Sequence, residues 1–238
     1  MKPIYIPKGK AKEYGDYAIN IYTGCPHRCF YCFAPGVLRR EAEKFHSCVE
    51  PRANIVEEVK RQLDREAITG KTIHLCFTCD PYPEGYDTTA TREIIKAVKA
   101  AGNHVQILTK GDGSRDFDLL DGEDWYGVTI SCWDSMAREK EPGAVLPSER
   151  VKIAARARAA GIKAWASFEP VLDPTLVLRT LDASKFIFNK VKIGKLNYHP
   201  LPGVNWAAFG HEAELLCRQR GLDYYIKDSL RKEMEVAK

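Results

Sequence analysis

The sequence predicts an α/β fold: a partial (β/α)6 TIM-like barrel, with an open parallel sheet and outer helices. Short β-type runs alternate with helical patterns along the 238 residues, which is the order of βα units around a parallel sheet. Gly70, Gly102 and Gly161 stand where a helix would close before the next strand. The units number about six, fewer than the eight of a closed barrel, so we expect the barrel to stay open.

The expected elements follow one another in order. The β-type runs are residues 17–22, 72–77, 104–108, 125–131, 163–168 and 186–193. The helical patterns between them cover residues 51–66, 88–101, 148–160 and 174–181. Because barrel enzymes carry their sites at the carboxyl ends of the strands, we expect functional residues just after these runs.

The pattern changes after residue 193. Pro200 and Pro202 interrupt the chain, a helix is expected over residues 204–220, and residues 222–226 are typical of a short strand. No linker rich in Gly, Pro or Ser separates a second domain. We therefore expect a single domain over residues 1–238, with a core over about residues 15–195 and a C-terminal helical and strand extension over residues 196–238.

Composition indicates a soluble globular protein, with 45% hydrophobic and 29% charged residues and a mean hydropathy of −0.35. No apolar run suits a signal peptide or a membrane span, so we expect a cytoplasmic protein without a membrane partner. Eight cysteines in a chain of this length favour thiols or metal ligands over a disulfide scaffold. The net charge of +4 neither requires nor excludes a nucleic-acid partner.

Three cysteines directly follow the first expected strand. Cys25, Cys29 and Cys32 have the spacing C-x3-C-x2-C. Thiolates in a compact loop are the ligands of iron–sulfur clusters, and three of them leave one iron open for a substrate or cofactor. The alternatives are free thiols or a zinc site, with His27 or His46 as a further ligand.

The triplet resembles the hallmark of the radical S-adenosylmethionine (SAM) superfamily, C-x3-C-x-aromatic-C, with Tyr31 as the aromatic residue. Within that superfamily the chain is most similar to the group named after spore photoproduct lyase, whose cluster loop reads approximately N-x-Y-x-G-C-x-H-x-C-x-Y-C. The residues in register are Asn20, Tyr22, Gly24, His27 and Tyr31. Further similarity runs through residues 78–82, 91–93, 108–110, 141–143 with Arg150, and 168–170.

The resemblance implies a radical SAM enzyme in which Cys25, Cys29 and Cys32 hold a [4Fe-4S] cluster. S-adenosyl-L-methionine would bind the open iron, and its reductive cleavage would give a 5′-deoxyadenosyl radical that abstracts hydrogen from a substrate. A reductant such as flavodoxin or ferredoxin is the implied partner. The substrate is open, and a DNA lesion is one candidate. A zinc-stabilised nucleic-acid-binding module without catalysis and an iron–sulfur electron-transfer protein are the competing functions.

Polar and aromatic residues near the expected strand ends are candidates for binding S-adenosylmethionine. Thr78 and Asp80 suit its ammonium, Lys110 its carboxylate, and Glu169 its ribose hydroxyls. Their structural alternatives are a turn before a proline for the first two and a solvated loop for the lysine. The full cofactor-binding set is Tyr31 for the adenine, Thr78, Asp80, Lys110, Ser131 for ribose or carboxylate, Arg150, which alternatively pairs with Glu141, and Glu169.

Three further cysteines are candidates for a catalytic role. Cys79, or else Cys76 or Cys132, would donate a hydrogen atom to a substrate radical, as the resemblance to spore photoproduct lyase implies. An inert buried thiol is the alternative for each of them. Cys217 stands alone on an expected helix, which disfavours a second cluster.

Overall fold

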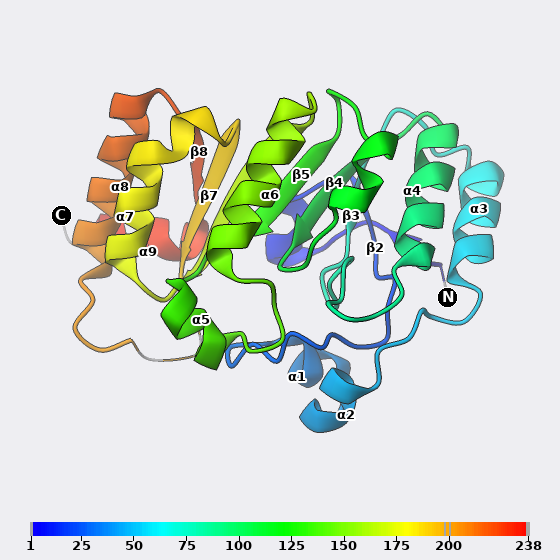
Figure 1. The fold of residues 1–238 in the computed structure, drawn as a ribbon, viewed down its shortest axis with the longest axis horizontal. Coiled ribbons are helices and arrows are strands. Elements are labelled where there is room, and N and C mark those ends of the chain that lie inside the picture. Colours follow the sequence, from blue (N-terminus) through cyan, green and yellow to red (C-terminus); the bar gives the residue numbers. More distant parts are fainter. Residues whose placement is uncertain (1, 198, 200, 237–238) are drawn as a thin grey trace.

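The computed structural model describes residues 2–197, 199 and 201–236, and within them the strands form one eight-stranded sheet in chain order (Figure 1). The first strand pairs antiparallel with the second, and every later pair of neighbours is parallel. The predicted α/β class with an open, mostly parallel sheet is therefore confirmed. The strands are β1 (Ile4–Tyr5), β2 (Tyr17–Ile19), β3 (Thr72–Leu75), β4 (His104–Thr109), β5 (Trp125–Thr129), β6 (Lys163–Val171), β7 (Lys190–Lys195) and β8 (Asp223–Ile226).

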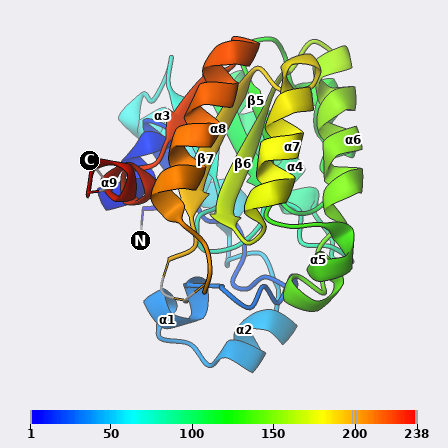
Figure 2. The same cartoon turned by 90° about the vertical axis from the view of Figure 1, so that its left-hand side faces the viewer.

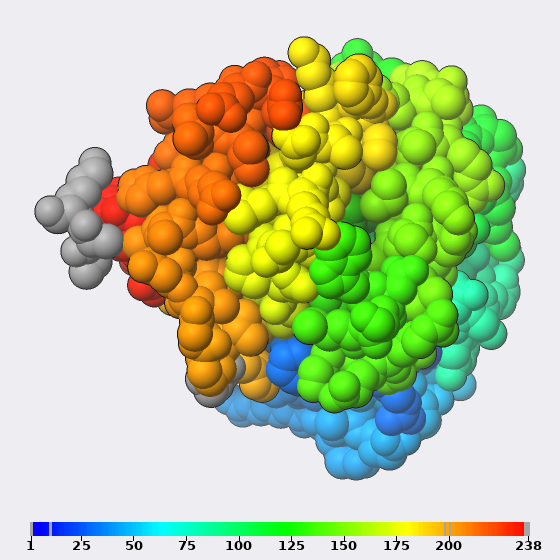
Figure 3. Space-filling model, turned by 60° about the vertical axis from the view of Figure 1, so that its left-hand side comes forward, coloured from blue at the N-terminus to red at the C-terminus, as the bar shows by residue number. Residues whose placement is uncertain are grey.

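The long helices cover one face of the sheet (Figures 1 and 2). They begin with α3 (Ile55–Glu66), where Ile55, Val59 and Leu63 recur every four residues and are buried. Figure 3 shows part of this outer face, where the orange, yellow and green parts of the chain lie side by side. The other long helices of this face are α4 (Thr89–Ala100), α6 (Pro147–Ala159), α7 (Pro174–Ala183) and α8 (Trp206–Arg220). The shorter α9 (Asp228–Val236) runs across them and packs against α8 (Figure 2).

The N-terminal segment lies against the inner face of the sheet. A short 3-10 helix, η1 (Gly9–Glu13), leads to Tyr14, whose ring packs against His74 and Trp165 with centroid distances of 5.1 and 6.0 Å. The helices of the loop regions lie beyond the carboxyl edge of the strands, at the lower side of Figure 1. They are α1 (Ala34–Leu38), α2 (Ala42–Ser47) and α5 (Asp134–Lys140).

Several element boundaries differ from the expected ones. The strand expected over residues 186–193 was wrong at its start, because Phe186 closes a 3-10 turn, η3 (Ser184–Phe186), and is 82% exposed. β2 ends at Ile19 because the chain then turns into the cysteine loop. The expected final strand is present as β8 and extends the sheet beyond the six units. Pro200, expected to interrupt the chain, lies outside the described residues.

Four helices and one strand had no sequence prediction: α1, α2, α5, α9 and β1. The strand and three of these helices are too short to show a clear periodicity, with two residues in β1 and five in α1. No helix in the described part of the chain is long and apolar enough to cross a membrane.

Candidate functional site

The loop of the three cysteines joins β2 to α1 and rests on α2. The backbone N–H of Cys25 donates to the Phe45 carbonyl over 3.2 Å, and His46 Nδ1 lies 2.8 Å from the Cys25 carbonyl oxygen. Gly24 allows this approach, because a Cβ there would lie 2.2 Å from the Phe45 carbonyl oxygen. Backbone contacts thus hold the loop, and Cys25, Cys29 and Cys32 are free thiols that form no disulfide.

The other flank of the loop packs on the segment after α5. The Phe30 N–H donates to the Lys140 carbonyl over 3.0 Å, and the Gly143 N–H donates to the His27 carbonyl over 3.2 Å. Inside the loop, the His27 ring is 2% exposed and both of its nitrogens have partners. Nδ1 lies 3.5 Å from Asp80 Oδ2, and Nε2 accepts from the Glu84 N–H over 3.4 Å.

These contacts bear on the zinc alternative. His27 uses both ring nitrogens, which argues against it as a zinc ligand, whereas the contact of His46 involves Nδ1 and not Nε2. Over residues 2–197, 199 and 201–236, only His104, Asp121 and Asp124 bring three ligand atoms within 4.8 Å of one another. The three cysteine sulfurs are thus not gathered like the ligands of one zinc ion, whereas a cubane cluster binds each cysteine on a different iron.

The surroundings of the three thiols favour their protonated form. Burial raises the pKa of Cys29 to about 11 and also raises the pKa of Cys25 and Cys32. A bound cationic metal would reverse this preference, because metal ligation deprotonates the thiol. Three partly buried thiols in a loop at the carboxyl edge of a parallel sheet therefore fit an iron–sulfur cluster.

Glu141 connects the cysteine loop to β5 and α6. Tyr31 and Ser131 donate hydrogen bonds to its Oε1, and Arg150 Nη2 donates to Oε2 over 2.5 Å. Burial alone would raise the pKa of Glu141, but Arg150 and Lys110 lower it to about 2. Glu141 is therefore a buried carboxylate that accepts hydrogen bonds on both oxygens.

Beside the cysteine loop lies a cavity of about 490 Å³. Six of the predicted site residues line it: Tyr31, Cys76, Cys79, Asp80, Lys110 and Glu169. Seven others are not among its lining residues: Cys25, Cys29, Cys32, Thr78, Ser131, Cys132 and Arg150. The guanidinium of Arg150 is fully buried and also donates to the carbonyl oxygens of Val145 and Thr129 over 2.6 and 2.8 Å. Its position fits the alternative given for it, a structural pairing with Glu141.

The residues after β3 and β4 form the polar part of this cavity. Asp80 accepts from the N–H groups of Tyr82 and Lys110 over 2.8 and 2.9 Å and from the Thr109 hydroxyl, so it ties the ends of the two strands together. Burial alone would lower the pKa of Lys110, but Cys29 and Glu141 raise it. Its ammonium lies 5.4 Å from the centre of the Tyr31 ring. The cavity thus has a charged ammonium next to the cysteine loop.

Thr78 carries a buried hydroxyl without a hydrogen-bond partner in the described structure. Asn20 fixes the backbone around it, because Asn20 Oδ1 accepts from the N–H groups of Phe77 and Thr78 over 2.8 and 2.9 Å. An unpaired buried hydroxyl is costly and is expected to find a partner in a ligand or a water molecule. The Thr78 hydroxyl could bind a polar group of a cofactor, and the three thiols of the cysteine loop could bind its metal.

The three candidate donor thiols have different surroundings. Cys76 and Cys79 face the cavity, and the Tyr22 N–H lies 3.4 Å from Cys79 Sγ. Burial raises the pKa of Cys79, but Cys76 and the Tyr22 N–H lower it below its ordinary value. Cys132 is fully buried beside Ala137, and burial raises its pKa to about 12. Two of the three candidate donor thiols, those of Cys76 and Cys79, therefore line the cavity.

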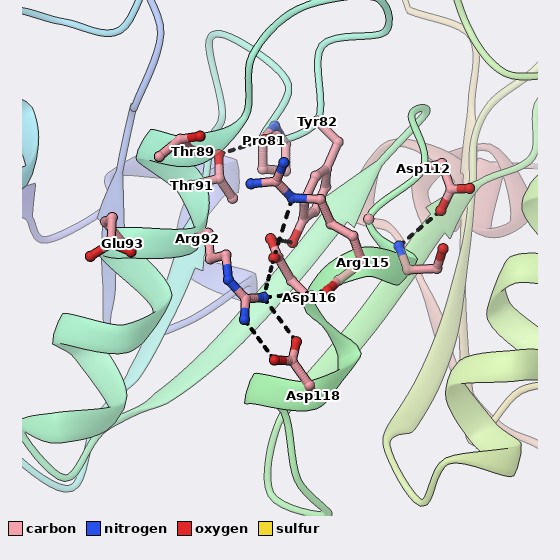
Figure 4. Close-up of polar contacts among 12 residues, drawn as sticks. Pro81, Tyr82, Thr89, Thr91, Arg92, Glu93, Asp112, Arg115, Asp116 and Asp118 are labelled. Carbon is pink, nitrogen blue, oxygen red and sulfur yellow. Dashed lines mark hydrogen bonds and ion pairs between the residues drawn. The ribbon is translucent and has the colours of Figure 1, made fainter.

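The motif at residues 91–93 braces the loop after β3 rather than the cavity (Figure 4). Thr91 Oγ1 donates to the Pro81 carbonyl over 2.6 Å. Arg92 bridges Asp116 and Asp118, with distances of 2.8 and 2.6 Å, and Asp116 in turn accepts from the Tyr82 hydroxyl over 3.1 Å. This network holds the loop that carries Asp80.

Sequence reasoning missed residues that come from the two ends of the chain. Tyr14 and Lys227 line the cavity, together with Lys8, Leu196 and Asn197. Lys227 Nζ lies 2.6 Å from Glu169 Oε2. No sequence motif marks these positions, because their segments precede or follow the βα repeat.

Comparison with known proteins gives matches over most of the chain. The family model described as Radical SAM superfamily matches residues 19–187. An uncharacterised protein of Mycobacterium tuberculosis is 31% identical over 169 residues, which are 66% of this chain and 49% of that protein. An uncharacterised protein of Methanocaldococcus jannaschii is 29% identical over 183 residues, which are 74% of this chain and 66% of that protein. The match thus spans about half the length of the mycobacterial relative, at 49%.

Two kinds of solved structure share the fold. A cysteine-to-alanine variant of spore photoproduct lyase with dinucleoside spore photoproduct has a TM-score of 0.68 at 14% identity, covering 93% of this chain and 78% of that chain. SuiB of Streptococcus suis bound to S-adenosylmethionine has a TM-score of 0.62 at 14% identity, covering 88% of this chain and 50% of that chain.

Proposed function

The chain belongs to the radical SAM superfamily, and we propose that Cys25, Cys29 and Cys32 hold a [4Fe-4S] cluster beside a cavity for S-adenosylmethionine. The single observation that carries this proposal is the position of the cysteine loop at the carboxyl edge of the sheet, where Tyr31 and Phe33, the neighbours of Cys32, line a cavity of about 490 Å³. Bound there, the reduced cluster would supply the electron that cleaves S-adenosylmethionine to a 5′-deoxyadenosyl radical.

The chain's own residues bind and orient the cofactor in this proposal. The Lys110 ammonium pairs with the carboxylate of the methionine moiety. The unpaired Thr78 hydroxyl does not line the cavity and would have to turn toward it to accept from the ammonium of the same moiety. Glu169 accepts from the ribose hydroxyls, while Tyr31 packs toward the adenine. Asp80 lines the cavity but holds the two strand ends, and Ser131 and Arg150 act through Glu141 rather than by direct contact.

The substrate radical is quenched, in this proposal, by a thiol at the cavity. Cys79 is the first candidate, because it faces the cavity and Tyr22 fixes its sulfur, and Cys76 is the second. Cys132 would need a rearrangement to reach the same cavity, since its side chain is fully buried.

The substrate and the redox partner are proposed only as classes. Phe30 and Trp133 are 43% and 42% exposed, and such aromatic side chains can stack on nucleic-acid bases, so a DNA lesion is one candidate substrate. A flavodoxin or ferredoxin would supply the electrons. All eight cysteines are free thiols, which fits a reducing compartment, and we place the enzyme in the cytoplasm.

The test is anaerobic reconstitution with iron and sulfide, followed by dithionite and S-adenosylmethionine. We expect absorbance near ~400 nm, typical of iron–sulfur clusters, and formation of 5′-deoxyadenosine. Cys29→Ala should lose both signals, whereas Cys48→Ala removes an exposed cysteine outside the triplet and should keep them. A colourless protein with one zinc per chain would contradict the proposal, and a coloured protein that never cleaves S-adenosylmethionine would favour electron transfer.

A further inference from the structure

A network of polar side chains links both ends of the chain to β6 at the wall of the cavity. Lys227, between β8 and α9, places Nζ 2.6 Å from Glu169 Oε2 on β6. The same ammonium donates to the Tyr14 hydroxyl over 3.0 Å, and this hydroxyl lies 3.4 Å from Glu169 Oε2. Lys227 is 5% and Tyr14 8% exposed, so both partners of Glu169 are largely buried.

The network binds one oxygen of the Glu169 carboxylate, Oε2, and leaves the other, Oε1, available to a ligand. Both contacts of Lys227 and Tyr14 are to Oε2. No described residue donates a hydrogen bond to Oε1, although Glu169 lines the cavity. Burial alone would lower the pKa of Lys227, but Tyr14 and Glu169 raise it, so the ammonium stays charged.

The neighbouring strand makes room for this arrangement. Gly194 on β7 lies against both side chains, and a Cβ there would be 3.0 Å from Glu169 Cδ and 3.0 Å from Lys227 Cδ. Three segments far apart in the chain therefore meet at one carboxylate. Tyr14, Gly194 and Lys227 all lie outside residues 19–187, which the family model matches.

We propose that Lys227 and Tyr14 are positioning residues that hold Glu169 with Oε1 turned to the ribose diol of the bound nucleoside. This inference rests on the proposed function, because it takes the cavity to bind S-adenosylmethionine. A carboxylate fixed through one oxygen presents the other as a charged acceptor, and such hydrogen bonds are stronger than neutral ones. The segments before and after the matched region thus complete the cofactor site.

The test compares two nucleosides that differ in one ribose hydroxyl. Dissociation constants for 5′-deoxyadenosine and 2′,5′-dideoxyadenosine are measured on the reconstituted protein by equilibrium dialysis. The wild type should prefer the nucleoside with both hydroxyls by about tenfold, the scale of a hydrogen bond to a charged group. Lys227→Met should lower this ratio towards one, and Lys227→Arg should restore much of it. Tyr14→Phe should give a partial loss, because Lys227 still holds Oε2.

Lys192 provides a matched control. Its ammonium also lies on the Tyr14 ring, 3.9 Å from the centroid, and donates to the Glu13 carbonyl over 2.8 Å. It therefore contacts the same N-terminal segment, but it is not an ion-pair partner of Glu169 among the described residues. Lys192→Met should keep the preference for the full ribose. A general loosening of this segment would instead lower the ratio in both lysine variants, which would overturn the proposal.

The outcomes separate this inference from the proposed function. A wild-type protein that binds neither S-adenosylmethionine nor 5′-deoxyadenosine would contradict the proposed function itself. A wild type that binds S-adenosylmethionine but does not distinguish the two nucleosides overturns the ribose role of Glu169. An unchanged ratio in Lys227→Met overturns the positioning role, and if that variant does not fold, an unchanged ratio in Tyr14→Phe does so.

Discussion

Arg150 Nη2 lies 2.5 Å from Glu141 Oε2, and neither side chain has significant contact with solvent. Glu141 also accepts from Tyr31, which stands between the last two cysteines of the loop. The ion pair therefore links α6 directly to the proposed cluster site. It lies behind the cavity wall rather than in it, so its effects should appear first in stability and cluster retention.

We expect Arg150→Met to lower the free energy of unfolding by about 3–5 kcal/mol, because it leaves a buried carboxylate without its partner. Guanidinium denaturation under anaerobic conditions measures this loss. The double variant with Glu141→Gln should regain part of it, since neither charge then remains unpaired. Arg156→Met, on the same helix but 59% exposed at its side chain, should change stability by less than about 0.5 kcal/mol. Equal losses in Arg150→Met and Arg156→Met would contradict this account.

The close approach of the cysteine loop to α2 gives a second prediction. Gly24→Ala would place a Cβ 2.2 Å from the Phe45 carbonyl oxygen and 2.8 Å from the Cys48 carbonyl oxygen, so the loop must move. We expect lower iron content after reconstitution and weaker absorbance from the cluster. Gly36→Ala is the matched control, because a Cβ there has nothing within 4 Å. Normal iron content in Gly24→Ala would show that the loop tolerates the shift.

The cysteine loop and several strand-end residues could be predicted from the sequence because their information is local. The spacing of Cys25, Cys29 and Cys32 is a short-range pattern, and Lys110 and Glu169 each follow or end a recognisable β-type run. In a parallel sheet such positions meet at one edge whatever the details of packing. The periodicity of the βα units therefore predicts which residues lie near the site.

Contacts over long chain separations could not be predicted in this way. Arg150 meets the carbonyl of Thr129, and Tyr14 meets Lys227 across 213 positions. The second contact does not follow from periodicity, because the N-terminal segment and the extension lie outside the βα repeat. The first lies within the repeat, but periodicity does not say which carbonyl a buried arginine meets. The sequence does not distinguish a buried structural arginine from a cofactor-binding one. The position of Arg150 behind the cavity could therefore be found only from the three-dimensional structure.

The different surroundings of the thiols predict an order of alkylation. In the native protein, iodoacetamide should modify exposed Cys48 first and Cys79 next, because Cys79 is partly exposed at the cavity and has a lowered pKa. Buried Cys132 and Cys217 should react last, since burial raises the pKa of each to about 12. Mass spectrometry of digested samples gives the order. S-adenosylmethionine should protect Cys79 but not Cys48, and equal protection of both would argue against a ligand in this cavity.

Lys192 predicts a pH dependence of stability on the alkaline side. Burial, followed by the charge of Lys227, lowers the pKa of Lys192 from 10.5 to about 8, and the side chain is 4% exposed. Between these two values the unfolded chain binds more protons at this site than the folded protein, so the free energy of unfolding rises with pH. The wild type should therefore gain stability relative to Lys192→Met from about pH 8 to pH 10. Chemical denaturation of both proteins across this range measures the difference, in which titrations common to both cancel. The other charged groups that act on Lys192 are Glu13, Lys190 and Glu169, and all of them remain in the variant.

A stability difference between wild type and Lys192→Met that stays constant or falls with pH would show that Lys192 keeps its proton in the folded protein.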